Sequence, residues 1–177
     1  MAIVACAVPM LRGQGVQGRA VGTCDEATLA RPGRGVAYSG VVQNSDHRFP
    51  VTIPGGLVGW GAAPDAPFHG FTIYLDSGRA ACLIFEIHLR VELPEDRNRA
   101  ESSRKRGRPV AVGNRRGWET VESGLAGGRA VAGVNVSIEL PREGYTNDAS
   151  ISLITPKEDL PRNRLVLDRF IGSFHFE

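Results

Sequence analysis

The sequence lacks any apolar stretch long enough to form a membrane-spanning helix. Such a helix needs about 20 consecutive apolar residues, and no run in the 177 residues approaches that length. The sequence also lacks a strong excess of charge of either sign, because 21 basic residues stand against 19 acidic ones. We therefore predict no transmembrane segment, and the charge balance points to no particular class of partner.

The familiar signatures of catalysis are missing as well. The chain contains no Gly-x-Ser-x-Gly nucleophile motif, no His-Glu-x-x-His zinc motif, no Walker-type phosphate loop and no Cys-x-x-Cys pair. We therefore predict no catalytic residue, no cofactor and no bound metal. A protein without enzymatic activity is favoured over an enzyme.

Cysteine is scarce, with only Cys6, Cys24 and Cys82 in the chain. Their spacing does not match that of a metal site. If Cys6 is lost in processing, Cys24 and Cys82 remain as a candidate disulfide. The same two residues fit equally well as inert free thiols, so both interpretations stay open.

Glycine and arginine, by contrast, are abundant. The chain has 22 glycines and 11 prolines, and every basic residue other than Lys105 and Lys157 is an arginine. This bias raises the frequency at which short Arg, Gly and Pro motifs arise by chance. The length of 177 residues, with 42% hydrophobic and 23% charged residues, is ordinary for one globular domain.

The N-terminal region, residues 1–35, differs from the rest of the chain. Residues 2–11 are apolar, Ala5-Cys6-Ala7 has the form of a signal-peptidase site, and residues 3–6 resemble a bacterial lipobox. No basic segment precedes them. Either the chain starts within a longer signal peptide or residues 1–11 are an apolar tail, and we favour the first. Residues 12–35 are rich in Gly, Arg and Thr and are predicted to be flexible.

Alternating apolar residues predict strands from residue 36 onward. The clearest case is 81–91, where every second residue is apolar and the residues between them are mostly polar. Further strands are predicted at 36–43, 48–53, 70–75, 110–112, 134–138 and 149–155. The first two, joined by turn residues 44–47, form a predicted hairpin. Residues 118–125 fit either a strand or a weak helix, and 94–109 are predicted to form a mobile basic loop.

One helix is predicted at the C-terminal end. Thr155-Pro156-Lys157-Glu158 has the form of a capping box with proline at the first helical position. Apolar residues then recur at helical spacing between Val166 and Phe174. Residues 36–177 are thus predicted to form a single α+β domain, an antiparallel β-sheet with the C-terminal helix packed on one face.

Two stretches of the chain resemble segments of PsbP-like domains. Phe49-Pro50-Val51-Thr52-Ile53-Pro54-Gly55-Gly56-Leu57 resembles their early strand and Pro-Gly entry. Residues 151–156, the helix and Ser173-Phe174-His175-Phe176 resemble their closing segment. The chain is also similar to small secreted bacterial proteins of unknown function. The resemblance implies an antiparallel sheet flanked by helices, on a scaffold used mainly for binding and assembly, and it transfers no functional residue.

The most specific short motif is the core of an AT-hook within residues 104–109. An AT-hook lays its arginines in the narrow minor groove of A·T-rich DNA. On this interpretation Arg104, Lys105, Arg106 and Arg108 are the candidate nucleic-acid-binding residues. A solvated basic loop between strands explains the same residues, and DNA is not the partner that we expect.

Two weaker patterns carry alternative chemistry. Residues 13–18 match the dinucleotide fingerprint Gly-x-Gly-x-x-Gly, but no strand and helix flank them as that site requires, so no cofactor site is predicted. Cys82, Glu86 and His88 fall on one face of the strand at 81–91. Glu86 and His88 could orient one another as a base or bind a metal, but polar residues on a solvated face are the preferred explanation.

The leading hypothesis from the sequence is a non-catalytic binding or accessory module of an exported bacterial protein. It would be periplasmic or secreted and would bind an unknown protein or small-molecule ligand. The alternative is an intracellular DNA-associated protein that uses residues 104–109.

Overall fold

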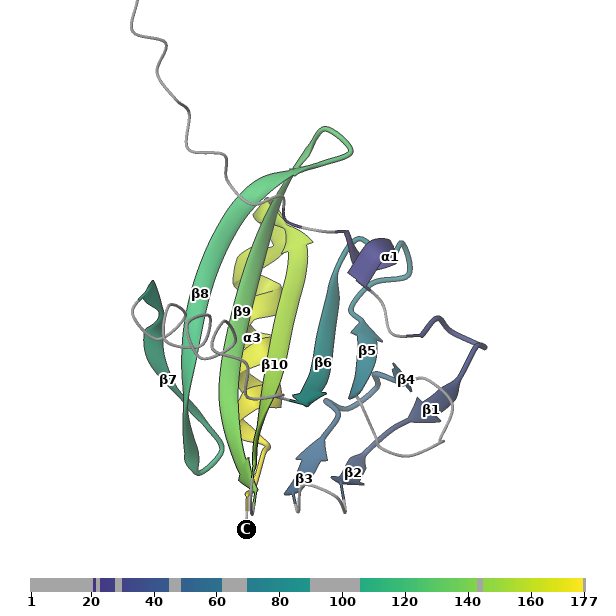
Figure 1. The fold of residues 1–177 in the computed structure, drawn as a ribbon. Helices are drawn as coiled ribbons and strands as arrows, with labels where there is room; N and C mark the ends of the chain where they lie inside the picture. The colour runs from purple at the N-terminus through teal and green to yellow at the C-terminus, as the bar shows by residue number, and fades with distance from the viewer. Residues whose placement is uncertain are drawn as a thin grey trace, which may run out of the picture.

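A computed structural model describes residues 21, 23–27, 30–44, 49–61, 70–89, 106–142 and 145–176. These residues form a large antiparallel sheet, a small two-stranded sheet and a long C-terminal helix that covers one face of the large sheet (Figure 1). The predicted α+β fold class, an antiparallel sheet with a C-terminal helix packed against it, is confirmed.

The strands follow the chain as β1 (Val36–Tyr38), β2 (Val41–Asn44), β3 (Phe49–Thr52), β4 (Gly59–Gly61), β5 (Gly70–Tyr74), β6 (Cys82–Leu89), β7 (Arg108–Val112), β8 (Arg115–Ala126), β9 (Arg129–Arg142) and β10 (Tyr145–Pro156). The large sheet has the order β1-β4-β5-β6-β10-β9-β8-β7, and β2 pairs with β3 in the small sheet. The last strand in sequence, β10, therefore lies in the middle of the large sheet, between β6 and β9.

The predicted hairpin at 36–53 is confirmed only in its second half. β2 pairs with β3 as expected, but the predicted strand 36–43 is two strands. Gly40 has a φ of +64°, and β1 continues instead to pair with β4. The ambiguous stretch 118–125 is part of strand β8. Strand β7 begins at Arg108, so the last two residues of the predicted loop 94–109 belong to a strand.

The helices are α1 (Cys24–Ala27), the 3-10 helix η1 (Lys157–Asp159) and α3 (Leu160–Gly172). The capping-box prediction is wrong, because no side chain caps η1 or α3. Strand β10 continues to Pro156, so Thr155 belongs to a strand and is buried. Its hydroxyl accepts a hydrogen bond from Asn163 Nδ2 at 2.8 Å instead of capping the helix. No helix in the described part of the chain is long and apolar enough to cross a membrane.

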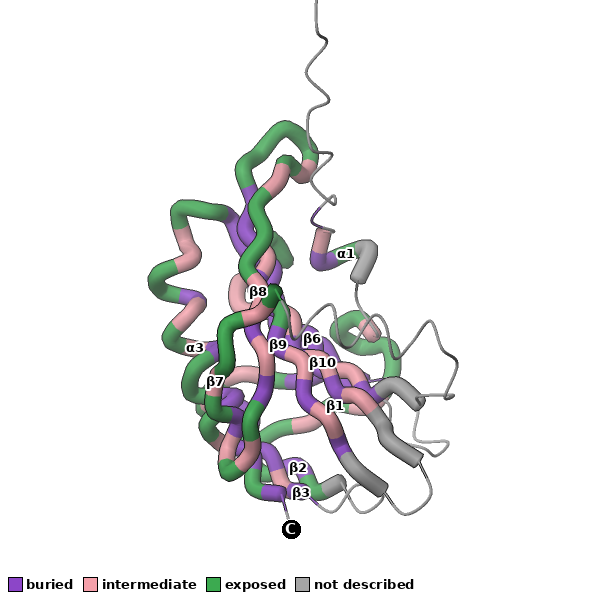
Figure 2. The backbone as a smooth tube through the Cα atoms, turned by 60° about the vertical axis from the view of Figure 1, so that its left-hand side comes forward, coloured by how far each residue is buried: buried purple, intermediate pink, exposed green. Residues whose placement is uncertain are grey.

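The main core lies between α3 and the large sheet. Alternate residues of β5, β6, β9 and β10 turn one apolar face towards the helix, and Leu167 and Phe170 of α3 pack against it with no exposed surface. Complete burial of such a side chain contributes about 1.5–3 kcal/mol. Figure 2 shows the buried segments along the middle of the sheet, whereas the tip of the β8–β9 hairpin is exposed.

The C-terminal tail, residues 173–176, closes this core at one end. Phe174 and Phe176 are buried, and their rings stack with centroids 5.6 Å apart. The Ser173 hydroxyl accepts a hydrogen bond from the Thr52 N–H at 3.0 Å, which ties the tail to strand β3. The tail thereby links α3 to the small sheet.

A smaller cluster lies on the opposite face of the large sheet. Val21 and Cys24 pack there against Cys82 and Ile154, which belong to β6 and β10. Cys24 and Cys82 are joined as a disulfide, with their Cα atoms 5.9 Å apart. This link holds the N-terminal segment against the face that α3 leaves uncovered.

Candidate functional site

The face of the large sheet that points away from α3 is polar beyond the Cys24–Cys82 disulfide. Strand register places Trp118 of β8 beside Ser137 of β9, and Thr120 beside Asn135. Asn135 in turn lies beside Ser152 of β10. All five side chains are at least partly exposed, because their neighbours along each strand point into the core instead. We call these five residues the open-face patch.

Hydrogen bonds across the strands fix part of this patch. Asn135 Nδ2 donates to Ser152 Oγ at 2.8 Å, and Ser137 Oγ donates to the Trp118 carbonyl at 3.4 Å. The patch thus offers hydroxyl and amide groups beside one indole ring. Such a ring supplies apolar contact area while the surrounding polar groups fix orientation, which is a common arrangement for binding.

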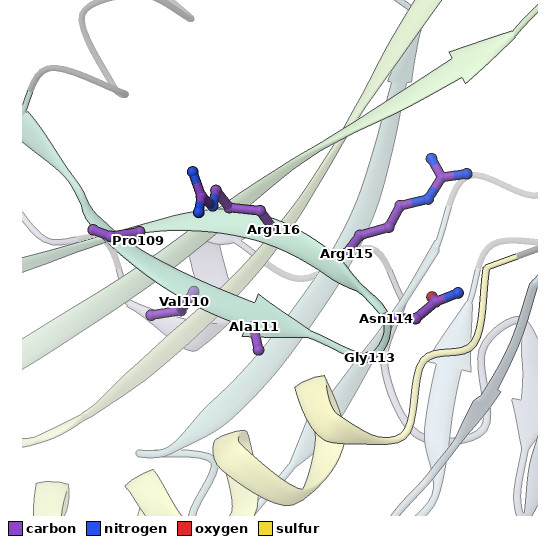
Figure 3. Close-up of a pocket in the computed structure, with 7 residues that line it drawn as sticks. All are labelled: Pro109, Val110, Ala111, Gly113, Asn114, Arg115 and Arg116. Atoms are coloured by element: carbon purple, nitrogen blue, oxygen red, sulfur yellow. The ribbon is translucent and has the colours of Figure 1, made fainter.

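A shallow depression of about 430 Å³ lies at the β7–β8 hairpin (Figure 3). One of its lining residues, Pro109, is the register partner of Trp118 in the open-face patch. Its lining consists of Pro109, Val110, Ala111, Gly113, Asn114, Arg115 and Arg116. None of these side chains is a nucleophile or a carboxylic acid. The lining therefore provides positive charge and apolar surface rather than groups for acid–base or covalent catalysis.

A buried carboxylate lies on the other face of the same hairpin. Glu119 of β8 is only 4% exposed. It accepts hydrogen bonds from Arg108 of β7 at 2.8 Å and from Arg164 of α3 at 2.5 Å. Burial alone would raise the pKa of this carboxyl group, but the hydrogen bonds and charges of Arg164 and Arg108 outweigh it and lower the pKa. Glu119 therefore joins β7, β8 and α3 as an ionised group.

The structure separates the residues of the AT-hook motif. Arg106 and Gly107 precede β7, whereas Arg108 and Pro109 belong to it and pair with β8. The guanidinium group of Arg108 is held by Glu119. Arg104 and Lys105 lie outside the described residues. Arg108 is thus part of a folded hairpin, while DNA binding by such a motif needs its arginines in the minor groove.

The other candidate residues are not assembled into a site. Cys82 is bonded to Cys24, and Glu86 lies on the open face of β6, beside Ser150 of β10. The side chain of His88, the fingerprint at 13–18 and Cys6 lie outside the described residues. Within the described ranges, no group of three or more His, Cys, Asp or Glu residues is arranged to hold a metal ion.

Comparison with known proteins places the fold. No protein-family model and no curated protein matches the chain. Among solved structures it is similar to LpqN of Mycobacterium tuberculosis, a protein involved in cell envelope biogenesis, with a TM-score of 0.55 and 10% identity over 78% of this chain and 90% of LpqN. A structure from Bacteroides thetaiotaomicron gives a TM-score of 0.53 and 10% identity over 81% of this chain and 49% of that chain.

A third similar structure is the PsbP protein CyanoP of Synechocystis sp., with a TM-score of 0.41 and 12% identity over 84% of this chain and 98% of CyanoP. The fold is PsbP-like. The predicted resemblance is confirmed for the fold by the two structures with TM-scores above 0.5. Identities of 10–12% carry no functional residue from these proteins to this chain.

Three residues that organise the hairpin, Gly113, Asn114 and Glu119, were not predicted from the sequence. Gly113-Asn114 lies between two strands and is a signal for a two-residue β-turn. Glu119 alternates with Gly117 and Val121 on the α3 face of β8. From the sequence alone, however, a charged residue is expected to be exposed to solvent. Only the positions of Arg108 and Arg164 show why it is buried.

Proposed function

We propose that this protein is a non-catalytic binding or accessory module of an exported protein, and that its ligand binds on the open-face patch. The observation that carries the proposal is the open-face patch itself. α3 covers one face of the large sheet, while the other presents Trp118 among hydroxyl and amide groups. PsbP-like scaffolds, as the sequence resemblance implies, are used mainly for binding and assembly.

Two further observations support export. A disulfide between Cys24 and Cys82 fits an oxidising compartment, because thiols in the cytosol are kept reduced. LpqN, whose fold is similar, is involved in cell envelope biogenesis. A role at the cell envelope is therefore the one that we propose for this chain.

Binding on the open-face patch is tested with an array of defined envelope glycans and extended peptides. We expect a ligand that binds the wild type to bind Trp118→Ala at least ten-fold more weakly, because the indole supplies most of the apolar contact area. Leu165→Ala is the matched control, since Leu165 is an exposed apolar residue of α3 on the far side of the molecule. Equal binding by wild type and Trp118→Ala, or a loss only in Leu165→Ala, would overturn the site.

Export is tested by the intact mass and N-terminal peptide map of the native protein, with and without reduction. A processed N-terminus with Cys24 linked to Cys82 is the expected result. An intact Met1 together with free thiols would overturn export. DNA binding by residues 104–109 would then be measured directly, as a salt-dependent affinity that is lost in Arg106→Ala.

A further inference from the structure

Strand β8 is longer than the strand that pairs with its outer side. β7 pairs only with Arg115–Glu119, whereas on the other side β9 pairs with β8 up to Ala126. Figure 1 shows the β8–β9 hairpin projecting beyond the end of β7. Among the described residues, no strand pairs with the outer side of the seven residues from Thr120 to Ala126. We call this segment the β8 edge.

The two hairpin turns determine which backbone groups of the β8 edge point outward. Both turns have two residues, Gly113-Asn114 and Gly127-Gly128, and the residues that flank such a turn form a hydrogen-bonded pair. Odd-numbered residues of β8 therefore point their N–H and C=O groups towards β7, and even-numbered residues towards β9. Beyond Glu119, the outward groups are those of Val121, Ser123 and Leu125.

The side chains of this edge are unusually apolar for an exposed strand. Val121 and Leu125 lie on the α3 face and are 56% and 70% exposed. The neighbouring outer edge of β7 is blunted, because Pro109 occupies an outward-pointing position there and has no N–H to donate. The β8 edge contains no proline, and its single charged residue is Glu122.

We propose that a second copy of this chain pairs antiparallel with the β8 edge, about a two-fold axis that passes beside Ser123. In this register Val121 lies opposite Leu125 of the second copy, and Leu125 lies opposite Val121 of the second copy. Both exposed apolar side chains of each copy are therefore covered. Thr120 lies opposite Ala126 of the second copy, and Glu122 opposite Gly124. The two large sheets become one continuous sheet, joined by about six backbone hydrogen bonds.

The limits of the β8 edge favour a second copy over an unrelated strand. The edge ends at the turn residue Gly127 on one side and at the start of β7 on the other. Its central residue is Ser123, so a two-fold pairing centred there fills the whole edge without running into β7. Directly opposed residues include no pair of like charges. The two Glu122 residues are diagonal neighbours about 7–8 Å apart, so association should tighten when salt screens their repulsion.

A pair of cysteine variants tests the register. In the two-fold pairing the two Ser123 Cα atoms are about 5.5 Å apart, which a disulfide can span. The two Thr120 Cα atoms are offset by six residues, or about 20 Å, which it cannot. In a Cys6→Ser background we expect Ser123→Cys to form a cross-linked dimer on oxidation and Thr120→Cys to remain uncross-linked. Equal cross-linking of the two variants would overturn the register.

The dimer itself is tested by sedimentation equilibrium of the full chain over a range of concentrations. We expect twice the monomer mass for the wild type and the monomer mass for Ser123→Pro. The Ser123 N–H points away from β9, so proline there removes no hydrogen bond within the monomer. Val121→Lys is the second variant, should proline disturb folding, and it is also expected to be monomeric.

Three outcomes would overturn the proposal. The first is a wild type that is monomeric at every concentration, and the second is a dimer that persists in both Ser123→Pro and Val121→Lys. The third is a full chain that does not dimerise, together with a variant lacking residues 1–20 that does. A segment of the same chain would then be the occupant of the β8 edge. None of these results depends on the open-face patch, so the dimer and the proposed function can fail separately.

Discussion

The side chain of Asn114 forms two hydrogen bonds with the backbone of Phe176, which lies 62 residues further along the chain. Asn114 Nδ2 donates to the Phe176 carbonyl at 2.7 Å, and the Phe176 N–H donates to Asn114 Oδ1 at 2.9 Å. The guanidinium of Arg115 lies 4.9 Å from the centre of the Phe176 ring. The β7–β8 turn thereby holds the C-terminal tail in the position that buries Phe174 and Phe176.

Replacing Asn114 should loosen this tail. In Asn114→Ala both backbone groups of Phe176 lose their partner, and each unpaired group in a partly buried position costs about 1 kcal/mol or more. We expect the free energy of unfolding in urea to fall by about 1–3 kcal/mol. Arg116→Ala, an exposed change on the same hairpin, is the control and should change it by less than about 0.5 kcal/mol. Equal stability of the two variants would contradict the role of Asn114.

The turn also requires glycine at position 113. Gly113 has a φ of +54°, its N–H donates to the Ile171 carbonyl at 2.8 Å, and a Cβ atom there would collide with the carbonyl group of Phe174. Gly127 has a nearly identical φ of +56° with open space around the same position. Gly127→Ala should therefore cost only the backbone strain of about 1–2 kcal/mol, and Gly113→Ala clearly more. The free energy of unfolding of both variants is measured in denaturant. The difference between their losses gives the cost of the collision, because the backbone strain is common to both.

The elements that the sequence predicts well are those whose pattern is complete within one segment. The residues of β6 alternate without interruption, and α3 has its apolar stripe at helical spacing, so both were predicted. β8 was ambiguous because Gly117 and Glu119 occupy two of its core-facing positions, and only pairing with β9 identifies it as a strand. Thr155 fits a capping box, yet the local pattern does not show that β10 continues past it.

The candidate site was harder to predict because it depends on strand register. Trp118, Asn135 and Ser152 come from β8, β9 and β10, which are neighbours in the sheet, and they meet because the pairing register of these strands places them side by side. The local pattern of β8 was itself ambiguous, so it could not specify that register. The Cys24–Cys82 disulfide could not be predicted for a similar reason. The spacing of the two residues was compatible with a disulfide and with two free thiols, and only the packing of α1 against the sheet distinguishes these possibilities.

The disulfide should contribute measurably to stability. It joins residues separated by 58 positions, and closing a loop of that size in the unfolded chain is worth about 2–4 kcal/mol. We expect Cys24→Ser to unfold at a lower urea concentration than the wild type, and a reducing agent to lower the wild type to the same midpoint. Cys6→Ser is the matched control and should leave the midpoint unchanged. A wild type that is insensitive to reduction would contradict a stabilising disulfide.

Removing the buried carboxylate should destabilise the hairpin. Glu119→Gln keeps the shape of the side chain but leaves Arg108 and Arg164 without their shared anion, and breaking such a buried pair costs about 3 kcal/mol. Between the two partners, Arg164→Ala should cost more than Arg108→Ala, because the side chain of Arg164 is 24% exposed and that of Arg108 is 68% exposed. Urea unfolding of the three variants at neutral pH tests this order.

The same carboxylate predicts a pH dependence with a definite sign. The pKa of Glu119 is lowered in the folded state from its usual value of 4.5, so the unfolded chain binds the proton more tightly. The stabilisation is therefore complete above about pH 4.5 and is lost as the pH falls through the folded-state pKa. We expect the wild type to lose more stability than Glu119→Gln between about pH 7 and pH 3. Glu158→Gln, which removes an exposed carboxylate paired with Arg129, is the control. Each variant's pH profile is compared with that of the wild type. If Glu158→Gln differs from the wild type as much as Glu119→Gln does, then exposed surface charge explains the pH dependence and the burial of Glu119 does not.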